Sequence, residues 1–173
     1  MRGSDLLVRS VFVVQAGLLL TSFTEPVPGK EMPEQAQSPV FSHPGGFYSG
    51  SLFITLSSPT PRATIYYTTD GSDPIGSSAD NYLQPYDHSP VVLNSTTVVR
   101  ARSFKQGYLP SPITTRTFFI DEGTALPVIS LATDPQNLWD KKRGIYVNFA
   151  EDWGKPVHLE FYESTDGRGF YLT

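Results

Sequence analysis

The chain has 173 residues, of which 39% are hydrophobic and 17% are charged, and this is the composition of a globular protein rather than a disordered one. Its formal net charge of −4 argues against a nucleic-acid partner, whose binding would need a basic surface. The sequence contains no cysteine, which excludes disulfides, thiol nucleophiles and cysteine-ligated zinc.

Residues 1–24 contain a short apolar run, from Val11 to Phe23. The run is shorter than the roughly 20 residues of a membrane-spanning helix, so we expect no membrane span here, but it has the length of a signal-peptide core. Asp5 and the lack of an Ala-x-Ala cleavage site leave a remnant of an upstream domain as the alternative. Residues 25–38 combine prolines with Glu, Gln and Ser and show no periodicity, which predicts a flexible linker.

From Val40 onward, short strand patterns alternate with turn residues. Strands are expected at residues 40–42, 51–56, 64–69, 90–93, 96–104 and 113–120. No helical period competes with them. This pattern predicts an all-β fold, an immunoglobulin- or fibronectin-III-like antiparallel β-sandwich over residues 39–121. Its core is expected to include Ile54, Leu56, Ile65, Tyr67, Val99, Phe104 and Phe118.

The stretch from Ile65 to Pro74 is the organising element of this sandwich. Its first half is rich in β-branched and aromatic residues and reads as a strand, and its second half is a turn. We expect Gly71 to adopt a positive φ and Asp70 to accept a hydrogen bond within its own turn. Calcium would need about six to eight oxygen ligands. Pro74 interrupts the acidic series, so we predict no metal here.

The pattern changes after residue 123. Strands are expected at residues 126–131, 144–147, 156–163 and 169–172, with a hairpin turn at 164–167. Asp134 and Pro135 form a helix-start signal, so a short helix should begin there with Trp139 buried. Residues 125–173 therefore predict an incomplete α+β segment, and a chain that ends inside a hairpin suggests truncation at Thr173.

The predicted sandwich carries a set of sequence blocks in the order found in a known family. The blocks are Val40–Ser42, Gly46–Tyr48, Tyr66–Pro74, Thr97–Arg102 and Gly107–Ser111. Together they resemble the small β-sandwich module of the C-terminal region of chitobiase and β-hexosaminidase-type enzymes, and a related fucosidase-associated sandwich. The resemblance implies an accessory module that is secreted or lies at the cell surface.

The segment after the sandwich resembles a second family. Its blocks are Leu126–Leu131, Asn137–Asp140, Gly144–Val147 and Lys155–Phe161. They are similar to the opening of the CotH (spore-coat protein H) kinase family, whose members often carry the sandwich just upstream. In that family the groups that bind phosphate and Mg²⁺ lie further downstream, so the resemblance implies that any catalytic residues lie beyond Thr173.

No residue of this chain can be assigned to catalysis, to a cofactor or to a metal. The histidines at positions 43, 88 and 158 are far apart in sequence, and we expect them at surface or edge positions. Six aromatic residues are candidates for stacking on sugar rings: Tyr66, Tyr82, Tyr86, Tyr108, Trp139 and Trp153. Tyr66, Tyr82 and Tyr86 are the set that we expect to form a ligand-stacking surface, while each ring taken singly also fits a structural role.

Two functions remain open at this point. The first is a non-catalytic accessory or spacer module of an exported multidomain bacterial protein, with a polysaccharide or a cell-surface glycan as its partner. The second is the N-terminal part of a secreted CotH-type protein kinase. Both include neighbouring domains of the same polypeptide as partners, and neither includes nucleic acid or a membrane span.

Overall fold

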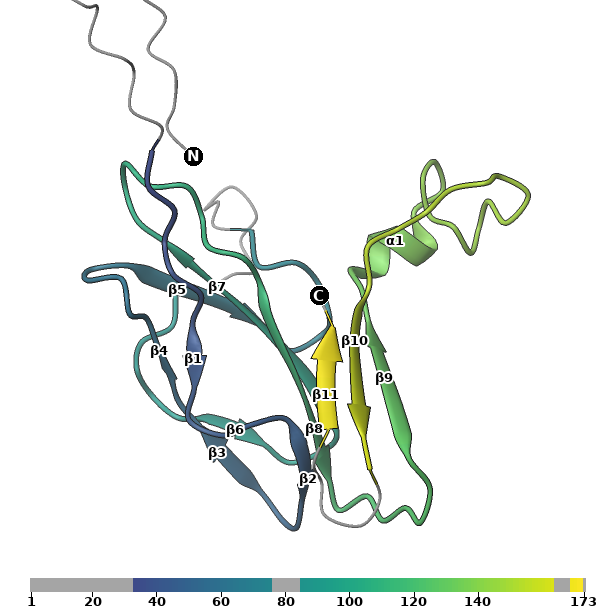
Figure 1. The fold of residues 1–173 in the computed structure, drawn as a ribbon, viewed down its shortest axis with the longest axis horizontal. Coiled ribbons are helices and arrows are strands. Elements are labelled where there is room, and N and C mark those ends of the chain that lie inside the picture. Colours follow the sequence, from purple (N-terminus) through teal and green to yellow (C-terminus); the bar gives the residue numbers. More distant parts are fainter. Residues whose placement is uncertain (1–32, 76–84, 164–168, 173) are drawn as a thin grey trace, which may run out of the picture. The chain divides into compact units, whose positions relative to one another are not determined.

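The computed structural model describes residues 33–75, 85–163 and 169–172. The predicted signal peptide or upstream remnant at residues 1–24, most of the predicted linker, Tyr82 and the predicted turn at 164–167 lie outside the described residues. The described part is mostly β, as predicted, with twelve elements in the order of Figure 1.

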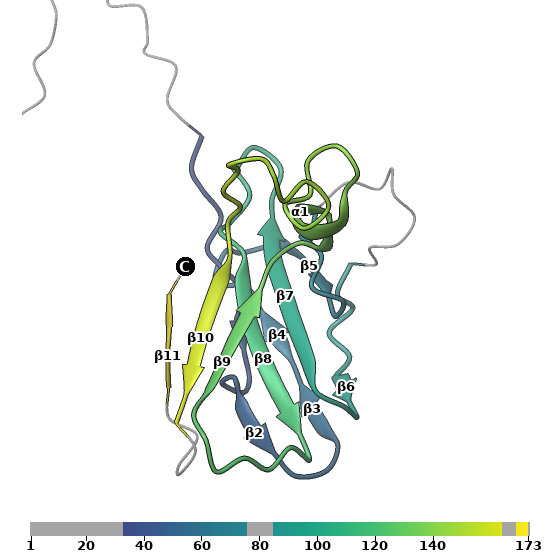
Figure 2. The same ribbon diagram turned by 90° about the vertical axis from the view of Figure 1, so that its right-hand side faces the viewer.

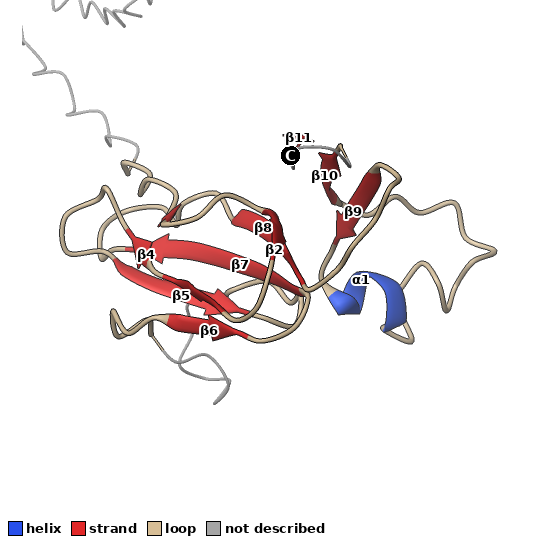
Figure 3. Cartoon of the chain, turned by 90° about the horizontal axis from the view of Figure 1, so that it is seen from below, coloured by secondary structure: helices blue, strands red, loops and turns tan. Residues whose placement is uncertain are grey.

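One layer of the sandwich is a four-stranded sheet in the order β2-β8-β7-β5. Its strands are β2 (Gly46–Tyr48), β8 (Thr114–Ile120), β7 (Thr97–Phe104) and β5 (Thr64–Thr68). The opposing layer consists of two ladders, β1 (Val40–Phe41) with β4 (Leu56–Ser57), and β3 (Leu52–Ile54) with β6 (Val91–Leu93). Figure 1 and Figure 3 show these layers from two directions.

The hydrophobic core lies between the two layers. Side chains alternate across each strand, so every second residue of β5, β7 and β8 points inward. The buried members are Ile54, Leu56, Ile65, Tyr86, Leu93, Val99, Ala101, Phe118 and Ile120. Five of the seven predicted core residues are therefore buried, and Tyr67 packs at the core edge. Phe104 is only half-buried, because it lies on the other face of its strand, against Tyr66.

The predicted antiparallel arrangement is wrong for one strand pair. β2 runs parallel to β8, with Gly46 opposite Phe118 and Tyr48 opposite Ile120. All other strand pairs are antiparallel. A pattern of alternating apolar residues carries no information on strand direction, so the sequence could not distinguish the two arrangements.

The segment after the sandwich forms a separate three-stranded antiparallel sheet in the order β11-β10-β9. Its elements are β9 (Val128–Ala132), the helix α1 (Pro135–Trp139), β10 (His158–Tyr162) and β11 (Gly169–Leu172). In Figure 2 this sheet lies in front of β8. The segment contains one short helix beside its three strands. The predicted strand at 144–147 is wrong, because residues 141–150 fold as turns hydrogen-bonded to the end of α1.

The last residues of the predicted linker are part of the sandwich. Ala36 is 2% exposed and its backbone N–H donates to the carbonyl of Leu109 at 2.9 Å. The N–H of Leu109 donates in turn to the carbonyl of Glu34 at 2.8 Å. The flexible-linker prediction is therefore wrong from residue 33 onward, because backbone pairing with a distant loop is not visible as a periodic pattern.

Candidate functional site

The Asp-Gly turn at the end of β5 has the predicted geometry. Gly71 has a φ of 83°, and Asp70 accepts hydrogen bonds from the Ser72 hydroxyl at 2.6 Å and the Ser72 N–H at 3.0 Å. These hydrogen bonds, first that of the Ser72 side chain, lower the pKa of the Asp70 carboxyl. Both carboxylate contacts are internal to the turn, which supports a structural role for Asp70 over a calcium-binding one.

A buried guanidinium connects this turn to the middle of the four-stranded sheet. Arg100 of β7 donates to the carbonyl of Gly71 at 2.9 Å and to the Thr115 hydroxyl at 3.4 Å, and it forms an ion pair with Asp73. Arg100 is only 8% exposed. The guanidinium is therefore held by contacts within the protein, which favours a structural role for Arg100.

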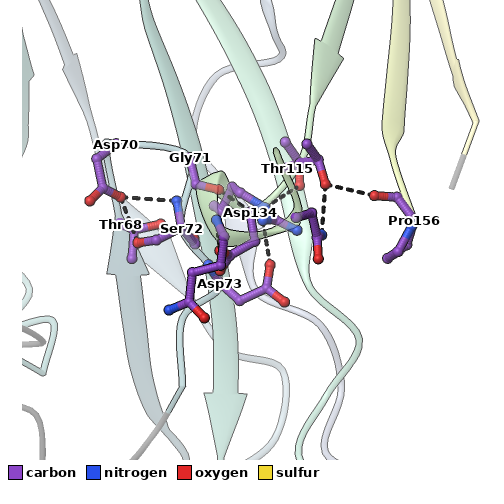
Figure 4. Close-up of polar contacts among 12 residues, drawn as sticks. Thr68, Asp70, Gly71, Ser72, Asp73, Thr115, Asp134 and Pro156 are labelled. Atoms are coloured by element: carbon purple, nitrogen blue, oxygen red, sulfur yellow. Dashed lines mark hydrogen bonds and ion pairs between the residues drawn. The ribbon is translucent and has the colours of Figure 1, made fainter. Parts of the chain in front are cut away.

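The same turn is hydrogen-bonded to the start of α1 (Figure 4). The N–H of Asp73 donates to Asp134 at 2.8 Å, and Asp134 also caps the helix by accepting from the N–H of Gln136 at 2.8 Å. The Thr133 hydroxyl then donates to the carbonyl of Pro156 at 2.7 Å. The predicted N-cap is confirmed, and the cap has a second role, since it joins the sandwich to the following segment.

A second polar contact lies between β8 and the three-stranded sheet. We call it the seam cluster, and it consists of Arg116, Thr117, His158, Glu160 and Tyr162. A Glu160 oxygen lies 3.8 Å from the His158 ring nitrogen and 4.0 Å from the Arg116 guanidinium. The Tyr162 hydroxyl donates to the carbonyl of Thr117 at 3.3 Å.

The surroundings of two groups in the seam cluster shift their pKa values. Burial opposes the charge of Glu160, but the polar side chains of His158, Thr117 and Tyr162 beside it outweigh burial and lower the pKa of this carboxyl. Burial, with the Glu160 charge nearby, raises the pKa of the Tyr162 phenol. The His158 and Glu160 side chains are only 7% and 3% exposed, so this part of the seam cluster is shielded from solvent.

The surface expectation for His158 is therefore wrong. Its signal was present in the sequence, because Glu160 follows it by two residues and alternate residues of a strand share one face. Burial of that face depends on the contact with β8, which the local pattern does not show.

The end of α1 and the residues after it form an open groove with a volume of about 870 Å³. We call it the aromatic groove. Its rings are Trp139, Tyr146, Phe149 and Trp153, accompanied by the aliphatic residues Leu138, Ile145 and Val147 and the carboxylate of Glu151. The segment that carries it projects beyond α1 in Figure 1. The groove combines solvent access with a defined lining.

The walls of the aromatic groove are held by backbone hydrogen bonds to the end of α1. The N–H groups of Ile145 and Tyr146 donate to the carbonyls of Asn137 and Leu138 at 2.8 and 3.1 Å. A Cβ on Gly144 would lie 2.5 Å from the Leu138 carbonyl oxygen, so only glycine allows this close approach.

Asp140 reinforces the same turn. It accepts from the N–H of Lys142 at 2.9 Å and of Arg143 at 3.0 Å, and these bonds, first that of Lys142, lower the pKa of its carboxyl.

The rings of the aromatic groove are unusually exposed for their size. Trp139 is 55% exposed, Tyr146 66% and Phe149 87%. Trp139 and Tyr146 lie side by side, with ring centroids 4.5 Å apart and an interplanar angle of 56°. The prediction that Trp139 is buried is wrong, because α1 has no buried residue and no described element covers its outer side.

The predicted stacking set of Tyr66, Tyr82 and Tyr86 does not form one described surface. Tyr86 is 7% exposed, and its hydroxyl accepts from the N–H of Leu56 at 3.2 Å within the core, so it cannot offer a ring face to a sugar. Tyr66 is half-buried on the opposite face of β5, against Phe104. Tyr82 lies outside the described residues. Of the six rings singled out from the sequence, the structure instead groups Trp139 with Trp153.

Comparison with known proteins matches one family model. Residues 54–118, from β3 to β8 and less than half of the chain, match the family described as Fn3 associated. No curated protein and no solved structure matched the chain. The matched residues include β4 to β7 and most of β8, which contribute to both packed layers, so the match supports a β-sandwich module here.

No helix in the described part of the chain is long and apolar enough to cross a membrane.

Proposed function

We propose that the chain provides a non-catalytic accessory module of an exported multidomain bacterial protein. In this proposal the sandwich is of the immunoglobulin or fibronectin-III type and is related to the chitobiase/β-hexosaminidase and fucosidase-associated sandwiches. The observation that carries it is that the Fn3-associated match falls within a two-layer sandwich, whose buried Arg100 is bound by the sandwich itself. Such a module spaces or orients its neighbours.

The module is also proposed to associate with carbohydrate, outside the cytoplasm. Sugar-binding surfaces use exposed aromatic rings, because the C–H faces of a pyranose pack on them while hydroxyls keep contact with water and polar side chains. The exposed rings of the aromatic groove meet this requirement. The set of Tyr66, Tyr82 and Tyr86 supports carbohydrate association less well, since Tyr86 is buried.

The experiment is a retention assay of the full chain on insoluble polysaccharides, with chitin and cellulose as supports and bovine serum albumin as the nonbinding protein control. Retention that soluble oligosaccharide competes away supports carbohydrate association. Retention no greater than that of albumin on every support would leave a spacer role alone.

One observation favours a CotH-type kinase as the second candidate function. The outer face of the three-stranded sheet is apolar, with Ile129 59% and Leu131 64% exposed. Leu159 and Phe161 are the residues of β10 paired with them. A face of this kind normally packs against further structure. We therefore keep the proposal that residues 125–173 belong to a CotH-type kinase domain whose remaining part covers this face.

This second candidate has its own test. The chain is expressed together with any polypeptide that its gene encodes after Thr173, and phosphate transfer from Mg²⁺-ATP to a protein substrate is measured. Transfer by the longer protein, with none by residues 1–173, supports the kinase candidate. A gene that ends at this position, or a longer protein without transfer, rules it out.

A further inference from the structure

We propose that the aromatic groove binds neutral, β-linked pyranose chains, and that Trp139, Tyr146 and Phe149 form its stacking surface. The proposal deepens the carbohydrate association proposed above and rests on it. It places the site in the segment after the sandwich, on α1 and the turns that follow.

The rings have the arrangement that sugar stacking needs. The ring centroids of Trp139 and Tyr146 lie 4.5 Å apart at an interplanar angle of 56°, and more than half of each residue is exposed, so the pair offers two adjoining ring faces set at an angle. Phe149 is 87% exposed and lines the same groove, and Trp153 is 42% exposed. Together they offer stacking positions for more than one sugar unit of an extended chain.

The charge of the groove selects a neutral ligand. Of the residues that the structure shows lining it, Glu151 alone is charged. A carboxylate accepts hydrogen bonds from sugar hydroxyls, but it repels the carboxylates or sulfates of an acidic glycan. A β-1,4-linked glucose or N-acetylglucosamine chain carries its hydroxyls equatorially, so its flat faces present C–H groups to aromatic rings. We infer that the groove binds chains with this flat C–H face, and separate titrations with the two oligosaccharides distinguish glucose from N-acetylglucosamine.

The groove is held in shape before any ligand binds. The backbone bonds from Ile145 and Tyr146 to the end of α1, and the close approach at Gly144, hold the backbone that carries Tyr146 against the helix that carries Trp139. Binding to a preformed platform avoids the entropic cost of ordering a loop. This distinguishes the groove from a loose collection of surface aromatics.

The two tryptophans make the groove directly observable. The chain contains only two, Trp139 and Trp153, and both line the groove, so all tryptophan fluorescence of the full chain reports on this site. Cellohexaose, chitohexaose and the acidic oligogalacturonate are titrated separately into the full chain. We expect saturable changes in emission with cellohexaose or chitohexaose, and none with oligogalacturonate.

Three substitutions locate the binding. Tyr146→Ala and Phe149→Ala should each weaken the affinity for the bound oligosaccharide by about tenfold or more. Phe149→Ala has little structural risk, because that ring is 87% exposed. Phe53→Ala is the matched control, since Phe53 is an aromatic residue 58% exposed on β3 of the sandwich, and it should leave the affinity unchanged.

The outcomes separate this inference from the proposed function. If the full chain is retained on polysaccharide but the groove variants bind as tightly as the unsubstituted chain, the aromatic groove is not the binding site, while the proposed carbohydrate association is supported. If the full chain binds none of the glycans, both the carbohydrate association and the assignment of the groove are wrong. Binding of oligogalacturonate alone, or a concentration-dependent dimer in light scattering that Phe149→Ala abolishes, would also overturn the inference, because the groove would then serve an acidic glycan or a second copy.

Discussion

The carboxylate of Asp134 accepts a 2.8 Å hydrogen bond from the backbone N–H of Asp73, 61 positions earlier in the chain. Its other oxygen caps α1 through the N–H of Gln136 at 2.8 Å. One side chain therefore ends the Asp-Gly turn of the sandwich and begins the helix that carries the aromatic groove. The sandwich and the segment after it are linked by specific hydrogen bonds as well as by the seam cluster.

Replacing Asp134 tests this link. Asp134→Ala removes both acceptors and should lower the free energy of unfolding by about 1–2 kcal/mol, measured by urea denaturation. Asp134→Asn keeps a helix cap but has one carbonyl oxygen, so it should recover part of the loss. Asp152→Ala, at an exposed position, should change little. Equal stabilities for all three variants would contradict the dual role of Asp134.

The Asp-Gly turn predicts a contrast between two neighbouring positions. Gly71 has a φ of 83°, so Gly71→Val should cost roughly 1–2 kcal/mol of stability through backbone strain, although the space beside it is open enough for a Cβ. Gly71→Asn should cost less, since Asn tolerates this conformation. Ser72→Ala removes only an exposed hydroxyl bond and should have a small effect in the same unfolding assay.

The sandwich core predicts a large effect at Ile65. This residue is 4% exposed between the layers, and Ile65→Ala should lower the free energy of unfolding by about 2–5 kcal/mol through lost burial and a cavity. Ile129→Ala is the matched control, because Ile129 is 59% exposed, and it should change stability by less than about 0.5 kcal/mol. A small loss at Ile65, comparable to that at Ile129, would show that the layers do not pack as described.

The seam cluster predicts a loss of stability in acid. The pKa of Glu160 is lowered in the folded protein, so this carboxylate contributes stability that is present above its unfolded-state pKa, near 4.5, and is lost as the pH falls through the folded value. Unfolding curves between pH 7 and pH 3 measure this contribution. Glu160→Gln should flatten the acid limb of the profile, while Glu163→Gln, at an exposed position, should not.

The groups that face Glu160 define what the acid unfolding curves measure. His158 lies on its own strand, and Arg116, Thr117 and Tyr162 complete the surroundings. An acid limb that is the same in Glu160→Gln as in the unsubstituted chain would contradict this assignment.

Local chemistry made several features predictable from the sequence. The strands of the sandwich follow the alternation of apolar residues, the turn follows from Asp70-Gly71, and the helix start follows from Asp134-Pro135. Each of these depends on residues within a few positions of one another. Such patterns state which face of an element is apolar, but not which other element will cover it.

The remaining features depend on contacts between distant residues, and only the tertiary structure decided them. Tyr86 is buried because its hydroxyl and ring meet Leu56 and Tyr67 across the core, whereas Trp139 is exposed because no described element covers the outer side of α1. Both are aromatic residues in sequence contexts that permit either outcome. Strand alternation also could not show that β2 lies parallel to β8, or that His158 would be buried beside Glu160. Burial is a property of the partner surface, so the sequence determined the elements of this protein, and their packing determined which rings form a site.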